Sequence, residues 1–149
     1  MISAETAQSV LRGLEKSSNR GPAFRREAME ALDALPGYDW SGIYRLEADG
    51  LVLDEYVGAE TDHTHIAIGV GVCGTAVKED RNVLVEDVRQ LSNYLACSLQ
   101  TRSEIVVLIR RGEHVLGQID IDGHQVGAFD ASDEVFLENL GNLIAARWE

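Results

Sequence analysis

The spacing of apolar residues changes at Pro36-Gly37, and this change limits the fold more than any other feature of the chain. Before it, apolar residues recur every three or four positions, which predicts two amphipathic helices. The first ends near Ser17 to Asn19, and the second runs from Pro22 to Pro36. After it, apolar and polar residues alternate over 40–46 and 51–57, with Asp49-Gly50 between them. This second pattern predicts a β-hairpin.

Further strands are expected along the rest of the chain. Alternating segments at 65–68, 83–86, 104–110 and 115–122 predict short strands, the last two joined by a tight turn. A helix is predicted from about Ser132 to Trp148, capped by Asp130 or Ser132. The connections are mostly too short for the crossover helices of a parallel sheet. We therefore predict an α+β fold, in which a central antiparallel sheet of about six strands is flanked by N- and C-terminal helices that pack against one face.

One domain is expected over the 149 residues, because no linker or repeat divides the chain. It would consist of N-terminal helices over 1–37 and a part over 38–149 that holds the sheet, a long polar loop at 91–103 and the last helix. The net charge of −12 argues against nucleic acid as a partner. The chain has no basic leader followed by an apolar segment and no apolar stretch of about 20 residues, so we expect a cytoplasmic protein without a membrane partner.

The chain contains two cysteines, Cys73 and Cys97. Cys73 follows Gly69 and Gly71, which suggest a tight turn before a helix at 75–80. A thiol near a helix N-terminus favours the thiolate, but a buried structural thiol explains the position equally well. Cys97 lies in the polar loop, five residues before Arg102, and is a candidate nucleophile. The glycine turn lacks the Lys-Ser/Thr pair of a phosphate loop, so no cofactor is predicted.

Three carboxylates lie on the last two predicted strands: Glu104, Asp120 and Asp122. Asp120 and Asp122 share one face of a strand, because side chains alternate. The pattern alone favours a solvated outer face. The alternative is a cluster that binds a cation or keeps a proton for acid catalysis, because like charges raise one another's pKa. The four histidines lack zinc-site spacing, so we predict no metal.

Taken together, these segments resemble a GAF domain of the free methionine-(R)-sulfoxide reductase family, from about Asp39 to the terminal helix. The resemblance rests on five motifs: Asp39–Tyr44, Gly71–Thr75, Leu95–Cys97 with Ser103–Val106, Gly117–Asp122, and Phe129–Asp133.

The resemblance implies that Cys97 attacks the sulfur of free methionine sulfoxide, that methionine leaves, and that Cys97 is left as a sulfenic acid. A second thiol then forms a disulfide, which thioredoxin or another thiol reductant reduces. The family usually carries a further cysteine where this chain has Glu60–Thr64. Cys73 is therefore the internal candidate for the second thiol.

The same resemblance implies the substrate-binding residues. Trp40 and Tyr44 would wall the pocket, Ala96 would contact the substrate, and Glu104, Asp120 and Asp122 would bind its ammonium group. Glu104 and Asp122 would also serve in catalysis by sharing a proton with the sulfoxide oxygen. The alternative is a GAF module that binds a small ligand without turnover. A cyclic-nucleotide ligand is disfavoured, because carboxylates repel phosphate. A homodimer is a further expectation, since helices that flank one sheet face often pack against a partner.

Overall fold

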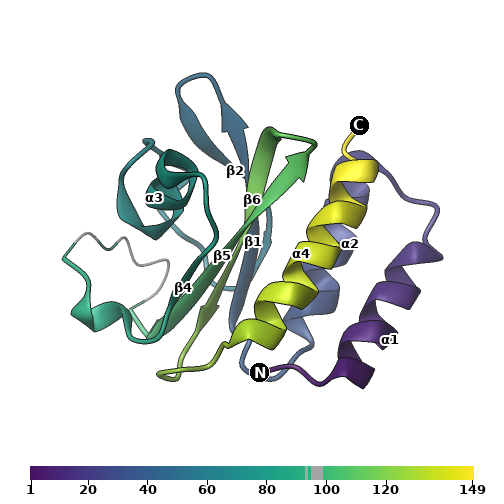
Figure 1. The fold of residues 1–149 in the computed structure, drawn as a ribbon, viewed down its shortest axis with the longest axis horizontal. Helices are drawn as coiled ribbons and strands as arrows, with labels where there is room; N and C mark the ends of the chain where they lie inside the picture. Colours follow the sequence, from purple (N-terminus) through teal and green to yellow (C-terminus); the bar gives the residue numbers. More distant parts are fainter. Residues whose placement is uncertain (93, 95–98) are drawn as a thin grey trace.

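The computed structural model describes residues 1–92, 94 and 99–149. Within them, six strands form one antiparallel sheet in the order β3-β2-β1-β6-β5-β4, with helices on both faces (Figure 1). The α+β prediction is therefore confirmed. The elements in chain order are α1 (Ala4–Glu15), α2 (Gly21–Asp33), β1 (Trp40–Glu47), β2 (Gly50–Val57), β3 (His65–Ile66), α3 (Gly71–Glu79), β4 (Val83–Val85), the 3-10 turn η1 (Val88–Gln90), β5 (Ser103–Arg111), β6 (His114–Gly123) and α4 (Ala131–Ala146).

Both predicted hairpins are present. Glu47 pairs with Gly50 where β1 turns into β2, and Gly50 has a φ of 139° that residues other than glycine rarely adopt. Arg111 pairs with His114 where β5 turns into β6, and Gly112 between them has a φ of 63°. Strand β6 pairs with both β1 and β5, so it lies in the middle of the sheet. Residues of β6 are consequently buried on both faces.

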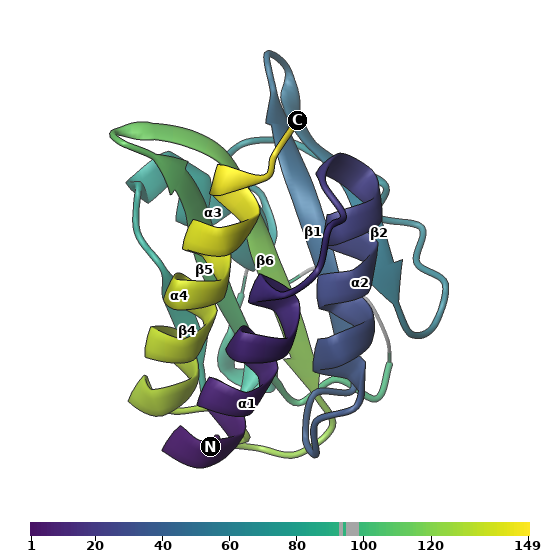
Figure 2. The ribbon, with the colours of Figure 1, turned by 90° about the vertical axis from the view of Figure 1, so that its right-hand side faces the viewer.

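One face of the sheet is covered by α2 and α4, with α1 lying between them on the outside (Figure 2). The main hydrophobic core fills this layer. It contains Phe24, Leu32, Ile43, Ile105, Ile119, Ile121, Phe136 and Leu140, among others. Arg25 of α2 is 5% exposed and pairs with Asp54 of β2, with 2.5 Å between Nε and Oδ2. This ion pair attaches α2 to the sheet.

The opposite face carries a second core, which the sequence analysis did not predict. Helix α3 lies over this face, where Val72, Cys73 and Ala76 pack against residues of the sheet that include Tyr44, Val106 and Leu108 (Figure 1). The N- and C-terminal helices pack against one face as expected, and the cover that α3 provides on the opposite face is the part that was missed. On this face, β5 presents Val106 and Leu108 and β1 presents Trp40 and Tyr44, and α3 with its flanking segments covers them.

Element boundaries differ from the predictions by a few residues. Helix α1 ends at Glu15 rather than near Ser17 to Asn19, and α3 begins at Gly71, four residues before the expected start. Helix α4 has Asp130 as its N-cap, one of the two candidates from the sequence, and Asp133 completes a capping box with it. In the part of the chain that the structure describes, no helix combines the length and apolar character needed to cross a bilayer.

Candidate functional site

The candidate site lies on the face of the sheet that α3 covers, and strand register brings its residues together. Asp122 of β6 lies between Trp40 of β1 and Glu104 of β5, in one row across three strands. Asp120 lies in the next row, opposite Gly42 of β1. Side chains in the same row point to the same face. The pairing therefore joins residues from segments that are far apart in the sequence.

All three predicted carboxylates are buried. The exposed fraction is 2% for Glu104, 0% for Asp120 and 1% for Asp122. The solvated outer face that the alternating pattern favoured is therefore wrong, because the three carboxyl groups are buried under α3 and its flanking segments. The pattern was misleading because an outer face and a face under a second layer of structure both allow polar residues at every second position.

Burial raises the pKa of Glu104 well above its ordinary value, and the nearby charges of Asp120 and Asp122 raise it further. Removing a carboxylate from water disfavours its charged form, and so does a second carboxylate beside it. Glu104 therefore keeps a proton at pH values where an exposed glutamate has lost it. A buried carboxylic acid of this kind can donate a proton to a bound ligand.

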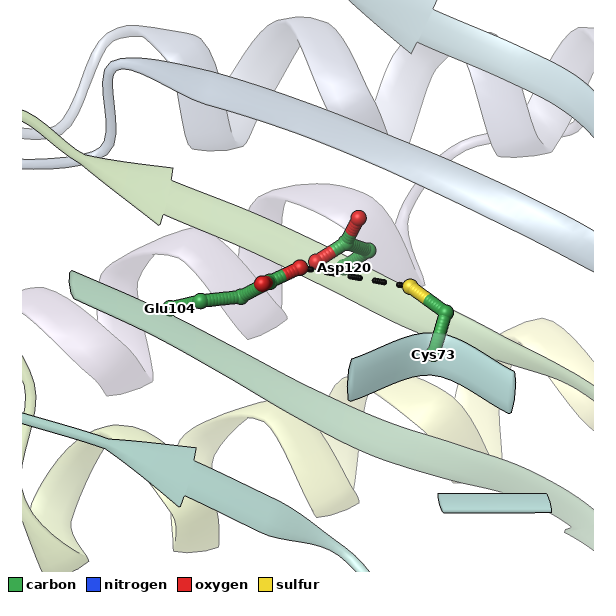
Figure 3. A group of neighbouring side chains, drawn as sticks. All are labelled: Cys73, Glu104 and Asp120. Atoms are coloured by element: carbon green, nitrogen blue, oxygen red, sulfur yellow. Dashed lines mark hydrogen bonds between the residues drawn. The ribbon is translucent and has the colours of Figure 1, made fainter. Parts of the chain in front are cut away.

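Cys73 faces this cluster from α3 (Figure 3). Its Sγ lies 3.9 Å from Oε2 of Glu104, at hydrogen-bonding distance for a thiol donor, and the residue is 5% exposed. The two residues line a cavity of about 10 Å³, together with Asp120, His63 and Ile66. The cavity has room for about one water-sized group. Sequence analysis left open whether Cys73 is buried or ionised near a helix N-terminus, and the structure shows a buried position in the first turn of α3.

The same residues are the set that could offer ligand atoms to a metal ion. One atom each of Cys73, Glu104 and Asp120 lies within 4.8 Å of the others. Groups this close can also share protons.

Trp40 and Tyr44 lie on the same face as the carboxylates, and both are fixed. The indole of Trp40 stacks on Tyr56, with ring centres 5.6 Å apart, and donates a hydrogen bond to the carbonyl of Ala59 at 2.9 Å. Gly42 leaves room for it, since a Cβ at that position would lie 2.4 Å from the ring. The hydroxyl of Tyr44 donates to the carbonyl of His63 at 2.9 Å. The two aromatic residues are therefore rigid neighbours of the acidic cluster.

Two predicted site residues, Ala96 and Cys97, lie outside the described residues, so their assignments stay predictions. Arg102, the cationic residue five positions after Cys97, is among the described residues. The guanidinium of Arg102 donates hydrogen bonds to the carbonyls of Leu99, at 3.2 Å, and Thr101, at 3.0 Å.

Gln118 is a site residue that sequence reasoning missed. It is completely buried, and its Nε2 donates a hydrogen bond to the carbonyl of Cys73 at 3.0 Å. The available signal was its position on β6, two residues before Asp120 and therefore on the same face. A lone amide in an apolar strand is easily taken for a surface residue.

Comparisons with known proteins agree with this arrangement. A family model described as GAF domain matches residues 19–149. The chain is 30% identical to GAF domain-containing protein A of Dictyostelium discoideum over 135 residues, which cover 90% of this chain and 85% of that protein. It is 36% identical to the free methionine-R-sulfoxide reductase of Escherichia coli (strain K12) over 108 residues, which cover 72% of this chain and 65% of that protein. That share is slightly less than two thirds of the reductase.

A solved structure agrees over the whole fold. The free methionine-R-sulfoxide reductase of Neisseria meningitidis, in complex with its substrate, matches with a TM-score of 0.87 and 27% identity. The match covers 99% of this chain and 92% of that one. It therefore includes every strand and helix that forms the candidate site.

Proposed function

This chain belongs to the GAF domain family and is related to the free methionine-R-sulfoxide reductases, and we propose that it reduces free L-methionine-(R)-sulfoxide to methionine. The observation that carries the proposal is the cluster of Glu104, Asp120 and Asp122, buried beside the thiol of Cys73 and the aromatic rings of Trp40 and Tyr44. Buried carboxyl groups without a binding role are costly to a fold. Their position between aromatic walls suits a small zwitterion with an apolar side chain.

Substrate recognition would come from charge and shape together. The α-ammonium group of a free amino acid pairs with the carboxylates of Asp120 and Asp122, and the aromatic rings contact its methylene and methyl groups. A methionine within a peptide has no α-ammonium group, so it would leave buried carboxylates without their partner. Sites built to bind a charged donor discriminate strongly against analogues that lack it. The cluster thus explains a preference for the free amino acid.

In the first chemical step, the sulfur of Cys97 attacks the sulfoxide sulfur. The oxygen moves to Cys97, which becomes a sulfenic acid, and the sulfoxide is reduced to the thioether of methionine. Glu104 assists by donating its proton to the sulfoxide oxygen, which makes the sulfur a better electrophile, and the thiol proton of Cys97 passes to the carboxylate of Glu104, so that no net proton is gained or lost. Asp122, next to Glu104 in the strand register, stabilises the shared proton.

Recycling of the enzyme requires a second thiol. The thiol of Cys73 loses its proton and attacks the sulfenic sulfur of Cys97, an S–S bond forms, the S–O bond breaks, and the oxygen leaves as water with that proton. Thioredoxin or another dithiol then reduces the disulfide and returns both thiols. Cys73 is proposed for this role because the sequence contains two cysteines, and Glu60–Thr64, where the family resemblance leads us to expect another, contains none.

A second function, ligand binding without turnover, is favoured by the lack of a cysteine in Glu60–Thr64, where the family resemblance leads us to expect one. The cavity beside Cys73 measures about 10 Å³, so methionine sulfoxide enters only if part of its wall moves. A chain that kept the acidic and aromatic residues as a ligand sensor would bind the same class of molecule. Its affinity would then be independent of Cys97.

The discriminating experiment compares free and N-acetylated L-methionine-(R)-sulfoxide as substrates, with dithiothreitol as reductant. The native protein should consume the free form at least about 100-fold faster, since acetylation removes the ammonium charge. Asp120→Asn should reduce this ratio, whereas Asp49→Asn, in the exposed turn between β1 and β2, should not. Equal consumption of both forms would contradict the recognition mechanism. Consumption of neither would reject the enzyme and favour the binding module.

A further inference from the structure

Gln118 makes an unusual contact between the sheet and α3. Its side chain is completely buried in the middle of β6, in the row between Tyr44 of β1 and Leu108 of β5. From there, Nε2 donates a hydrogen bond of 3.0 Å to the carbonyl of Cys73. A carbonyl oxygen accepts hydrogen bonds and cannot donate them, so the amide nitrogen must be the atom that faces it. The bond therefore connects the backbone of Cys73 directly to the strand that carries Asp120 and Asp122.

Stability alone does not explain an amide at this position. The Oε1 atom of Gln118 is buried and has no hydrogen-bond partner among the described residues. A protein with a buried amide that makes only part of its hydrogen bonds is usually less stable than one with an apolar side chain of similar size at that position. A leucine would fill the row between Tyr44 and Leu108 without that cost. The hydrogen bond to Cys73 is the feature that leucine would not reproduce.

Among the described residues, no side chain caps the N-terminus of α3. The N-cap residue, Val70, has no side chain that can accept a hydrogen bond from the helix, and Gly71 begins the helix with a φ of 66°. The first turn of a helix is less stable when no side chain caps it. The bond from Gln118 is thus a tertiary contact that holds the turn carrying Cys73, at the point where local sequence provides little.

We propose that Gln118 is a positioning residue that holds the first turn of α3 so that the thiol of Cys73 stays against Glu104. The bond acts on the backbone of Cys73, while the side chain of the same residue reaches Oε2 of Glu104 at 3.9 Å. Fixing the carbonyl therefore fixes the backbone position from which the thiol reaches Glu104. If the proposed function holds, the position of this turn also sets the angle from which Cys73 reaches the sulfenic acid of Cys97. The placement of Cys73 against Glu104 does not itself depend on turnover.

The surroundings of the thiol determine how its reactivity depends on pH. Titratable groups face it from each neighbouring element: Glu104 from β5, Asp120 from β6 with Asp122 beside them, and His63 from the opposite cavity wall. Burial and the carboxyl groups disfavour a thiolate, whereas the N-terminus of α3 favours one but moves together with Cys73 when the turn is released. A thiol released from this position should therefore ionise at lower pH and react faster.

The test measures alkylation of Cys73 by iodoacetamide between pH 6 and pH 10, in a Cys97→Ser background that leaves a single thiol. Gln118→Leu removes the donor. Gln118→Asn keeps an amide but withdraws it by one methylene. Ile119→Val is the matched control, because Ile119 is the next residue of β6, is equally buried, and faces the other core. Thermal unfolding of each variant is recorded in parallel.

Both Gln118 variants should alkylate about fivefold to tenfold faster than the background, the factor that one net hydrogen bond is worth. The pH midpoint of the reaction should also fall. Ile119→Val should leave the midpoint unchanged even if it lowers the melting temperature more. Profiles of Gln118→Leu and Gln118→Asn that superimpose on the background would overturn the proposal, and so would an equal shift in Ile119→Val. Because the assay needs no turnover, it tests the placement of Cys73 even if the protein proves not to be a reductase.

Discussion

Replacing Glu104 with glutamine should change how the stability of the protein depends on pH. The pKa of Glu104 is raised in the folded protein, chiefly by burial and then by the charges of Asp120 and Asp122. The folded state therefore holds a proton that the unfolded chain loses near the ordinary value of 4.5. Stability linked to that proton is complete below pH 4.5 and is lost as the pH rises toward the folded-state pKa.

The size of the effect follows from the single proton involved. While Glu104 is protonated in the folded state and ionised in the unfolded one, the free energy of unfolding falls by about 1.4 kcal/mol per pH unit. Glutamine has the same shape and no proton to lose. The difference in unfolding free energy between Glu104→Gln and the native protein should therefore be small at pH 4 and grow in favour of the variant above pH 4.5.

Urea denaturation at each pH unit between 4 and 8 measures this difference directly. Glu113→Gln, in the exposed turn between β5 and β6, is the control and should give a curve parallel to that of the native protein. If the curves for Glu104→Gln and the native protein are also parallel over the whole range, Glu104 does not hold an extra proton in the folded state. The account of the buried cluster as a proton donor would then be refuted.

Three further changes test other parts of the structure, and a fourth tests recycling. Gly42→Ala places a Cβ 2.4 Å from the ring of Trp40 and should cost about 1–3 kcal/mol in urea denaturation, with altered tryptophan fluorescence. Gly141→Ala, whose Cβ would meet its nearest atoms at 3.8 Å, should instead be neutral or stabilising by up to roughly 1 kcal/mol. Arg25→Met removes one of the two arginines that pair with Asp54, leaves Arg45 in place, and should cost about 1.5–3 kcal/mol by the same measurement. Cys73→Ser should stop repeated turnover with thioredoxin but not with dithiothreitol, and unchanged turnover with both would make Cys73 a structural residue.

Much of the fold could be predicted from the sequence, because its signals are local. Asp49-Gly50 and Gly112 fix the two hairpins, and the change of spacing at Pro36-Gly37 separates helices from strands. The position of α3 could not be predicted in the same way. Its cover of the second face depends on contacts with β5 and β6, and those contacts decide whether alternating polar residues are outside or inside.

The candidate site was predictable as a set of residues but not as an arrangement. Glu104, Asp120 and Asp122 were found from their pattern and from the family resemblance, yet pattern alone favoured exposure for them. Their burial results from the register of three strands and from the helix above them. Gln118 was missed because its role depends on the backbone of Cys73, which is 45 residues away in the sequence.

The central claim is tested most directly by following the loss of free L-methionine-(R)-sulfoxide by amino-acid analysis, with the S epimer as control. Dithiothreitol is the reductant, because it can replace any resolving thiol and so isolates the first chemical step. The account predicts that the native protein consumes the R epimer alone and that Cys97→Ser consumes neither. If the native protein leaves both epimers intact, or if Cys97→Ser is as active as the native protein, the proposed reduction by Cys97 is contradicted.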